Sequence, residues 1–234
     1  MYININIFKR IEKKYLLNEE QYQSLMNSID EHLEKDAYFE SNINNIYFDN
    51  DNYDLIINSI EKPIYKEKIR LRSYGIPSLN DTVFLEIKKK YNDIVNKRRI
   101  EITLQEFYDY FEKGIIPIKD EQIMNEIDYC FKKYDLKPKF FVSYNRNSYY
   151  DKDNKDLRIT FDKKLISRTD NLRLDYGNSG DEYFKNNTYI MEIKSLGALP
   201  LWFTNILSEL KIYPTSFSKI GKIYMKNKKE EVYV

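Results

Sequence analysis

Short segments in which polar and apolar residues alternate dominate the chain. This period of two is typical of half-buried β-strands, whose successive side chains point to opposite faces. The tight pair Asn92-Asp93 and a turn at residues 151–155 favour antiparallel neighbours. The pattern predicts nine strands, at residues 3–15, 44–50, 66–74, 82–91, 95–103, 139–149, 156–163, 187–195 and 219–225.

Apolar residues at helical spacing occur in four further segments. Thr103 and Glu106 have the spacing of a capping box, and Pro200 suits the first turn of a helix. The only histidine, His32, falls on the polar side of the first helix, where a solvated position is favoured over a catalytic role. The predicted helices cover residues 18–36, 103–114, 120–134 and 200–213, so the expected fold class is α+β.

The composition fits a single domain over residues 1–234. Hydrophobic residues make up 42% of the chain, and no stretch rich in Pro, Gly and Ser divides it. The single cysteine, Cys130, excludes an internal disulfide and has the spacing of a core residue. No apolar run reaches the roughly 18 residues that span a bilayer, and no secretory signal is evident, so we expect a cytoplasmic protein.

The net charge is close to zero, but the charges are unevenly distributed over the predicted strands. A formal net charge of +1 gives no argument for binding to nucleic acid or membranes. Residues two apart on a strand share a face, and on these strands the shared polar faces are mainly basic. The basic residues are Arg10, Lys14, Lys66, Lys68, Arg70, Arg72, Lys88, Lys90, Lys97, Arg99, Arg146, Arg158 and Lys194, against Glu12, Glu86, Glu101, Asp162 and Glu192.

Two explanations of this basic face differ in what covers it. An antiparallel sandwich routinely exposes charged residues to water on its outer faces. Like charges on neighbouring strands repel one another, however, so an ordinary wet face mixes signs, and this excess of one sign indicates an anionic ligand. If the sheet closes into a barrel of about eight strands, its interior admits one slender ligand, and a phosphate chain has that shape.

The residue types on these faces fit phosphate chemistry. Arg binds phosphate oxygens through a planar fork and Lys through a compact charge. Glu192, Glu12 and Glu86 are candidate ligands of Mg²⁺ or Mn²⁺, which prefer carboxylate and phosphate oxygens. The chain has neither a nucleophile beside a base nor a Walker sequence, so we expect phosphoryl transfer by positioning and charge stabilisation, without a covalent intermediate.

Several of these segments resemble motifs of the triphosphate tunnel metalloenzymes, and in particular of their vacuolar transporter chaperone (VTC) branch. The resemblance extends from about residue 5 to residue 225. The matching segments are FKRIEKKY (8–15), KIRLRSY (68–74), FLEIK (84–88), VNKRR (95–99), SYNR (143–146), LRITFD (157–162), MEIK (191–194) and SFSK (216–219).

This resemblance implies a closed antiparallel eight-stranded β-barrel, the triphosphate tunnel, with flanking helices. It implies a polyphosphate polymerase, an ATP:polyphosphate phosphotransferase that moves the γ-phosphate of ATP onto a polyphosphate chain with Mn²⁺ or Mg²⁺, and it makes Glu192 the metal carboxylate. The expected partners are ATP and polyphosphate, with no nucleic acid. The expected catalytic residues are Lys14, Arg70, Arg72, Lys88, Lys97, Arg146 and Arg158, and the phosphate-binding set adds Lys194 and Lys219.

The chain departs from the family pattern in two respects. Hydrolytic tunnel enzymes begin Glu-x-Glu-x-Lys, whereas Arg10 stands at the first of these positions, followed by Glu12 and Lys14. This favours the polymerase branch and leaves Glu12 either to bind metal or to pair with a basic neighbour. Eukaryotic relatives also carry a regulatory domain and membrane spans that do not fit in this chain, so a separate membrane protein at the inner face of the membrane is a candidate partner.

Three alternatives to a polymerase remain open at the level of sequence. The same tunnel could hydrolyse inorganic triphosphate or nucleoside triphosphates, because the two reactions differ only in the acceptor of the phosphoryl group. A non-catalytic polyphosphate-binding module is a second alternative. Nucleic-acid binding is the weakest, since the aromatic residues fall mostly on apolar positions and not beside the basic ones.

Overall fold

The computed structural model describes residues 10–92 and 94–232 of the chain. Contacts within the chain group these residues into two compact units. Unit 1 takes in the residues up to Ser41 together with Asn145–Lys164 and Phe184–Phe217. Unit 2 takes in Asn42–Tyr144, Leu165–Tyr183 and the residues from Ser218 onward. The chain passes between the units several times, and a single domain over residues 1–234 stays a prediction.

One antiparallel sheet contains all the strands. They hydrogen-bond in the order β1-β9-β7-β6-β2-β3-β4-β5, with β8 beside β7. The pairs β1–β9, β7–β9, β2–β3, β3–β4 and β4–β5 are antiparallel, as predicted. The strands are β1 (Arg10–Asn18), β2 (Leu33–Asp49), β3 (Tyr65–Tyr74), β4 (Thr82–Tyr91), β5 (Ile94–Thr103), β6 (Lys137–Asp151), β7 (Arg158–Arg168), β8 (Asp181–Glu182) and β9 (Thr188–Leu196).

The strand order corrects the prediction of a closed eight-stranded barrel. It has two ends, β1 and β5, which do not pair with each other within the described residues, so the sheet is open and has nine strands. The free edge of β5 has a physical basis, because Lys97, Arg98 and Arg99 follow one another there and remain wholly or partly exposed. Charged side chains along an edge oppose the addition of a further strand.

The predicted strand at residues 219–225 is wrong, since this segment lies in a helix. Ile220, Ile223 and Tyr224 are buried at helical spacing, and the hydroxyl of Ser218 accepts a hydrogen bond from the amide of Gly221 at the start of the helix. The first predicted strand, residues 3–15, is observed from Arg10, and its residues 3–9 lie outside the described part of the chain.

A helix occurs at each of the four predicted places, and three of the four also have the predicted extent to within a few residues. The helix expected at 18–36 ends early, because residue 33 already begins the long strand β2, and α2 was not predicted. The buried carboxylate of Asp49 starts α2 by accepting hydrogen bonds from the amides of Leu55 and Ile56. The helices are α1 (Glu19–Ile29), a 3₁₀ turn (Asp30–His32), α2 (Asp54–Glu61), α3 (Leu104–Lys113), α4 (Glu121–Tyr134), α5 (Leu201–Glu209) and α6 (Lys219–Val232).

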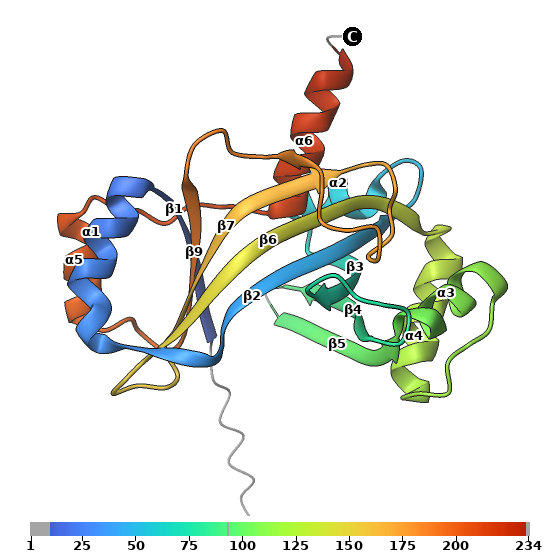
Figure 1. The fold of residues 1–234 in the computed structure, drawn as a ribbon, viewed down its shortest axis with the longest axis horizontal. Coiled ribbons are helices and arrows are strands. Elements are labelled where there is room, and N and C mark those ends of the chain that lie inside the picture. The colour runs from blue at the N-terminus through green and yellow to red at the C-terminus, as the bar shows by residue number, and fades with distance from the viewer. Residues whose placement is uncertain (1–9, 93, 233–234) are drawn as a thin grey trace, which may run out of the picture. The chain divides into compact units, whose positions relative to one another are not determined.

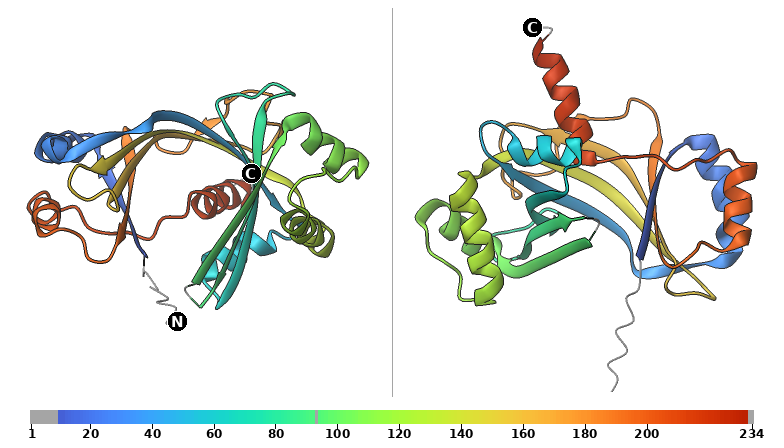
Figure 2. Two further views of the ribbon diagram at one scale, coloured as in Figure 1. Left: turned by 90° about the horizontal axis from the view of Figure 1, so that it is seen from below. Right: turned by 180° about the vertical axis from the view of Figure 1, so that it is seen from behind.

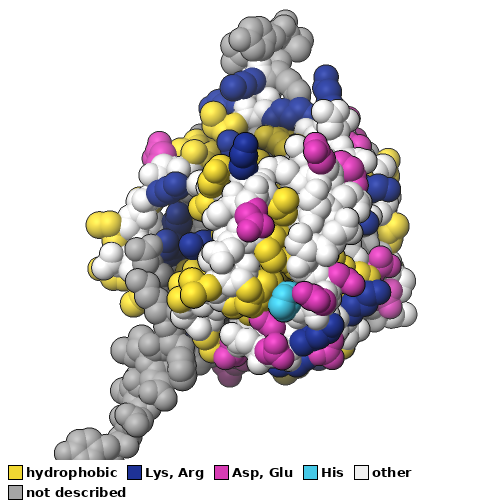
Figure 3. Space-filling model, turned by 90° about the vertical axis from the view of Figure 1, so that its left-hand side faces the viewer, with side chains coloured by type: hydrophobic (Ala, Val, Ile, Leu, Met, Phe, Trp, Pro, Cys, Tyr) yellow, Lys and Arg dark blue, Asp and Glu magenta, His cyan; other side chains and the backbone are white. Residues whose placement is uncertain are grey.

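In unit 1, α1 and α5 lie side by side (Figure 1) and close an apolar core over β1, β7 and β9. Leu25 and Ile29 of α1 and Phe203 of α5 are buried in this core. His32 stacks on the ring of Trp202 with 4.0 Å between centroids, so it packs beside α5. Figure 3 shows this histidine in cyan on a face where acidic and basic side chains are interspersed, as on an ordinary protein surface.

In unit 2, the apolar side of β3, β4 and β5 packs against α3 and α4. Ile69, Leu85 and Ile100, one from each strand, are buried there, and Cys130 of α4 joins the same core, as predicted. Figure 2 shows the three strands lying side by side and α6 lying beside α2. The apolar face of these strands is therefore covered by helices, which leaves their opposite face for polar side chains.

None of the helices in the described residues is both long enough and apolar enough to cross a membrane.

Candidate functional site

The basic face of unit 2 is built by the alternation of β3. Ile69 and Leu71 point into the core, and the neighbouring Lys68, Arg70 and Arg72 therefore lie on the other face of the strand. This is the face on which the sequence predicted phosphate ligands.

Three lysines from adjacent strands form one row across this face. The strand register sets Lys68 opposite Lys88, and Lys88 opposite Lys97. Like charges placed directly opposite one another repel and destabilise a sheet. The hydroxyl of Ser218, at the start of α6, lies 3.1 Å from the Lys68 ammonium. The repulsion within this row favours the binding of an anion, although Lys97 also has Glu86 as a partner.

In the next row along the strands, Arg70 lies between Glu86 on β4 and Tyr47 on β2. Arg70 lies opposite Glu86, and its Nε and one terminal nitrogen approach the same carboxylate oxygen at 2.7 and 2.6 Å. The other oxygen of Glu86 lies 2.6 Å from the Lys97 ammonium. The remaining terminal nitrogen of Arg70 donates to the hydroxyl of Tyr47, 3.2 Å away. Glu86 thus fixes both Arg70 and Lys97 in position.

Arg72 differs from Arg70 because its partners are neutral. Its Nε donates to the side-chain oxygen of Asn45 at 2.9 Å, and a terminal nitrogen lies 3.5 Å from the hydroxyl of Tyr144. Within the described residues, no carboxylate forms an ion pair with Arg72, although its side chain is buried. Lys219 lies 4.4 Å from the centre of the Tyr144 ring. Arg72 therefore keeps its charge available to a ligand.

The neighbouring cations keep the Glu86 carboxyl ionised. Burial alone would raise the pKa of this carboxyl, but Arg70, Arg72 and Lys97 outweigh burial and lower the pKa to about 2. A carboxylate whose pKa falls on folding stabilises the folded protein above its unfolded pKa, and that stability is lost as the pH falls through the folded value. The stability that Glu86 contributes is therefore lost as the pH falls from the usual pKa of a Glu carboxyl to about 2.

We expect the Glu86→Gln variant to lose about 3 kcal/mol of unfolding free energy at neutral pH, because Arg70 and Lys97 would be left without their carboxylate. Its stability should also fall less steeply than that of the wild type on acidification. Chemical denaturation at several pH values measures both effects. Glu101→Gln is the control, since Glu101 is exposed and pairs with Arg99. Equal losses in the two variants would contradict the role given to Glu86.

In unit 1, the predicted residues of β1 and β9 form a compact charged group. The Lys14 ammonium lies 3.6 Å from Glu12 and 3.9 Å from Glu192, and Lys194 lies 2.6 Å from Glu192. Burial would raise the pKa of Glu192, but Lys194 and Lys14, with Arg146, lower it to about 2. Glu192 is therefore ionised at neutral pH, as a metal ligand must be.

Two further predicted phosphate ligands of unit 1, Arg146 and Arg158, already form ion pairs with aspartates. Arg146 binds Asp162 through two nitrogens, at 2.6 and 2.8 Å, and Asp162 is buried. Arg158 donates to Asp36 at 2.6 Å. These aspartates fix the guanidinium groups in position and reduce the positive charge that each offers to a ligand.

A cavity of about 350 Å³ opens beside the charged group of unit 1. Glu12 and Lys14 line it from β1, and the segment Pro214–Phe217 lines it from the opposite side. This segment is tied to β1 by the amide of Thr215, which donates to the backbone oxygen of Lys14, and by the Lys14 ammonium, which donates to the oxygen of Phe217. The cavity has room for phosphate groups within reach of Lys14.

The three predicted metal carboxylates are not equally suited to hold a cation. No cluster of three or more His, Cys, Asp or Glu side chains with metal-binding geometry occurs in the described part of the chain. Glu12 and Glu192 lie on the neighbouring strands β1 and β9, on either side of Lys14. Mg²⁺ commonly uses one or two carboxylates and completes its shell with water and substrate phosphates. Both oxygens of Glu86, by contrast, are occupied by Arg70 and Lys97.

Sequence reasoning missed three residues that hold the predicted ligands in place. Asn45 and Tyr47 alternate on β2 and contact Arg72 and Arg70, and Asp36 binds Arg158. The period of two on residues 44–50 would have placed Asn45 and Tyr47 on one face. Asp36 could not be found in this way, because it fell inside the predicted helix at 18–36.

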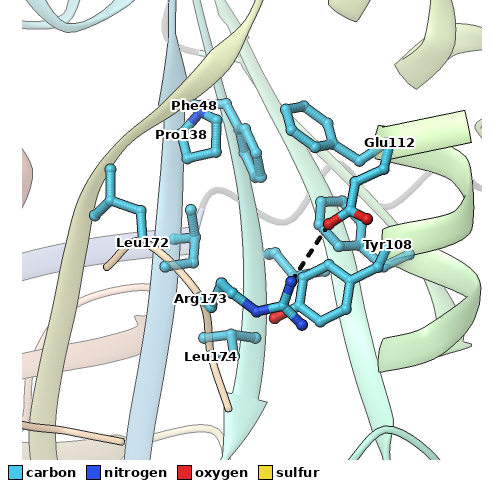
Figure 4. Close-up of a pocket in the computed structure, with 11 residues that line it drawn as sticks. Phe48, Tyr108, Glu112, Pro138, Leu172, Arg173 and Leu174 are labelled. Atoms are coloured by element: carbon cyan, nitrogen blue, oxygen red, sulfur yellow. Dashed lines mark hydrogen bonds and ion pairs between the residues drawn. The ribbon is translucent and has the colours of Figure 1, made fainter. Parts of the chain in front are cut away.

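A second cavity, in unit 2, is lined mainly by apolar side chains and is not suited to bind phosphate. It measures about 150 Å³ and lies between β2, β3 and α3, where Phe48, Leu71 and other apolar side chains line it (Figure 4). Its polar element is the ion pair of Glu112 and Arg173, 3.3 Å apart, shown as the dashed line. This cavity belongs to the apolar side of the strands that carry Tyr47 and Arg70.

Comparison with solved structures supports the fold. A proposed adenylate cyclase from Bacillus halodurans aligns with a TM-score of 0.55 and 15% identity, over 89% of this chain and 93% of that one. A proposed adenylate cyclase from Vibrio parahaemolyticus aligns at 0.50 and 10%, over 93% and 98%. A proposed adenylyl cyclase from Hippeastrum, described as having a dominant triphosphatase activity, aligns at 0.50 and 15%, over 90% and 93%. At these identities the likeness shows the fold alone.

Comparison with family profiles supports more than the fold. The profile of the VTC domain matches residues 9–225 and therefore covers the strands of both units and the charged residues described above. This confirms the resemblance found in the strand motifs. The chain belongs to the VTC-domain family.

Proposed function

We propose that this protein is an ATP:polyphosphate phosphotransferase, which transfers the γ-phosphate of ATP onto a polyphosphate chain. The observation that carries this proposal is the row of Lys68, Lys88 and Lys97 beside Arg70 and Arg72 in unit 2. Membership of the VTC-domain family supports the same reaction.

The size of the lysine row favours a chain of phosphates over a single phosphate. Neighbouring strands lie about 4.8 Å apart, so three residues in register span roughly 10 Å. A ligand with several linked phosphates matches this span and can contact all three ammonium groups at once. The repulsion among Lys68, Lys88 and Lys97 is then relieved by binding, and Arg72 offers a further charge without a competing carboxylate.

The carboxylates of unit 1 fit the Mn²⁺ or Mg²⁺ that this chemistry uses. Glu192, with Glu12 as a second donor, would hold the cation together with phosphate oxygens, while Lys14 and Lys194 bind further phosphate oxygens. When bound, such a cation stabilises the charge that develops on the transferring phosphoryl group. Glu86 instead serves to position Arg70 and Lys97.

Triphosphate hydrolysis is the second candidate. It is favoured by the similarity in fold to the Hippeastrum protein, whose described activity is that of a triphosphatase. The presence of Arg10 where hydrolytic tunnel enzymes carry a glutamate favours the polymerase.

The products formed from ATP distinguish the two candidates. The purified protein is incubated with ATP and Mn²⁺ or Mg²⁺, polymer is resolved on a gel, and free phosphate is measured in the same samples. The polymerase predicts a ladder of polymer with little free phosphate, whereas free phosphate alone would establish the hydrolase. Lys132→Ala is the control, because Lys132 is exposed on α4 and pairs with Asp128. Absence of both products would contradict the proposal.

A further inference from the structure

Tyr47 lies on the basic face beside Arg70, and the proposed reaction gives it no role so far. It lies on β2 directly opposite Arg70, and only 7% of it is exposed. The neighbouring residues Ile46 and Phe48 point into the apolar core, so the Tyr47 side chain lies on the face of Arg70 and Arg72. A phenol held among cations is chemically unlike the lysines and arginines around it.

Tyr47 completes the set of hydrogen bonds that orients Arg70. Glu86 accepts from the Nε side of the guanidinium, and Tyr47 accepts from its other terminal nitrogen at 3.2 Å. A neutral phenol that accepts this bond still has its own O–H to donate. A phosphate oxygen bound by Arg70 would therefore meet a second donor beside the guanidinium.

We propose that Tyr47 is a positioning residue of the phosphate site, which orients Arg70, donates its hydroxyl proton to a bound phosphate oxygen, and weakens phosphate binding when it ionises. This inference rests on the proposed function, since it concerns the same face. It adds a phenol to a site otherwise made of lysines and arginines.

The surroundings of Tyr47 favour ionisation at mildly alkaline pH. Burial alone would raise the pKa of the phenol, but Arg70, Lys68 and Arg72 outweigh it and lower the pKa to about 8. The other charged and titratable groups on the strands and helix of this face are Lys66, Lys68, Arg70, Arg72, Glu86, Lys88, Lys90, Lys97, Arg99, Glu101, Tyr144 and Lys219.

The sign of the pH effect follows from charge. The phenolate neutralises part of the charge of Arg70 and repels phosphate, whereas the neutral phenol leaves that charge to the ligand and can donate its proton to a phosphate oxygen, so phosphate binds preferentially to the protonated form. Bound phosphate in turn raises the pKa of Tyr47, because it adds negative charge beside the hydroxyl. By linkage, the apparent dissociation constant for tripolyphosphate should rise about tenfold from pH 7 to pH 9.

Calorimetric titration with tripolyphosphate over this pH range tests the proposal in the Tyr47→Phe variant. We expect weaker binding than in the wild type at pH 7 and a change of less than about twofold up to pH 9, because the phenol that hydrogen-bonds to Arg70 has been removed. The control is Tyr149→Phe: Tyr149 is equally buried, lies in the core of unit 1, and has its pKa raised to about 12 by burial, so this variant should keep the wild-type pH profile.

A spectroscopic titration of the wild type provides a test that does not depend on the variant. Tyrosinate absorbance should show one phenol ionising near pH 8, and tripolyphosphate should move this transition to higher pH. A tenfold loss of affinity retained in Tyr47→Phe, or a flat pH profile in the wild type, would overturn the inference and leave the proposed function standing. Failure of the wild type to bind tripolyphosphate at any pH would instead overturn the proposed function.

Discussion

Replacing Glu192 with Gln is expected to reduce metal-dependent turnover of ATP by at least about a hundredfold, since the cation contributes several kcal/mol of charge stabilisation in the transition state. Binding of tripolyphosphate should not weaken. The substitution removes a negative charge from beside Lys14 and Lys194, which makes the group more attractive to phosphate. Turnover with Mn²⁺ and calorimetric binding without metal measure the two effects separately.

Glu12→Gln is the companion variant for this experiment. Glu12 lies on the other side of Lys14 and is more exposed than Glu192. A comparable loss of turnover would make Glu12 a second metal ligand, whereas a small loss would leave it as a partner of Lys14. Thermal unfolding of both variants shows whether the loss of a buried ion pair lowers stability and so contributes to the loss of turnover. Unchanged turnover in Glu192→Gln would contradict the metal assignment.

Replacing Arg72 with Gln is expected to weaken tripolyphosphate binding by about 10- to 100-fold, the value of a charge-assisted hydrogen bond. Stability should change less than in Glu86→Gln, because the direct partners of Arg72 are the neutral Asn45 and Tyr144, and Glu86 keeps Arg70 and Lys97 as counter-charges. Calorimetry and chemical denaturation measure these two quantities.

The Arg98→Gln variant is the matched control for Arg72. Arg98 belongs to the same sheet, but it pairs with Glu126 of α4, on the helix-covered side of the strands. Its loss should leave tripolyphosphate binding unchanged. Equal weakening in the two variants would mean that binding follows overall charge and not the basic face of unit 2.

The alternation of polar and apolar residues predicted which side chains share a face of the candidate site more securely than it predicted the fold. Ile69 and Leu71 had to be buried for β3 to pack on the helices, and this requirement placed Lys68, Arg70 and Arg72 together on the opposite face. Local pattern determines which face a side chain takes, so this part of the site could be predicted from sequence.

Features that depend on distant parts of the chain could not be predicted in the same way. Closure of the sheet depends on whether β1 and β5 pair, and no local pattern specifies that. Residues 219–225 alternate well enough to suggest a strand, but they form a helix that buries Ile220 and Ile223, which are three residues apart, on one face. The aspartates that hold Arg146 and Arg158 are likewise distant along the chain or hidden within another predicted element.

The central claim is that the charged faces of this protein bind a phosphate chain, and a crystal structure with tripolyphosphate and Mn²⁺ tests it most directly. The account predicts phosphate groups on Arg70, Arg72, Lys88 and Lys97, and Mn²⁺ on Glu192. Phosphate bound only elsewhere, for example on exposed lysines of α6, with Arg72 still held by Asn45 and Tyr144, would contradict it.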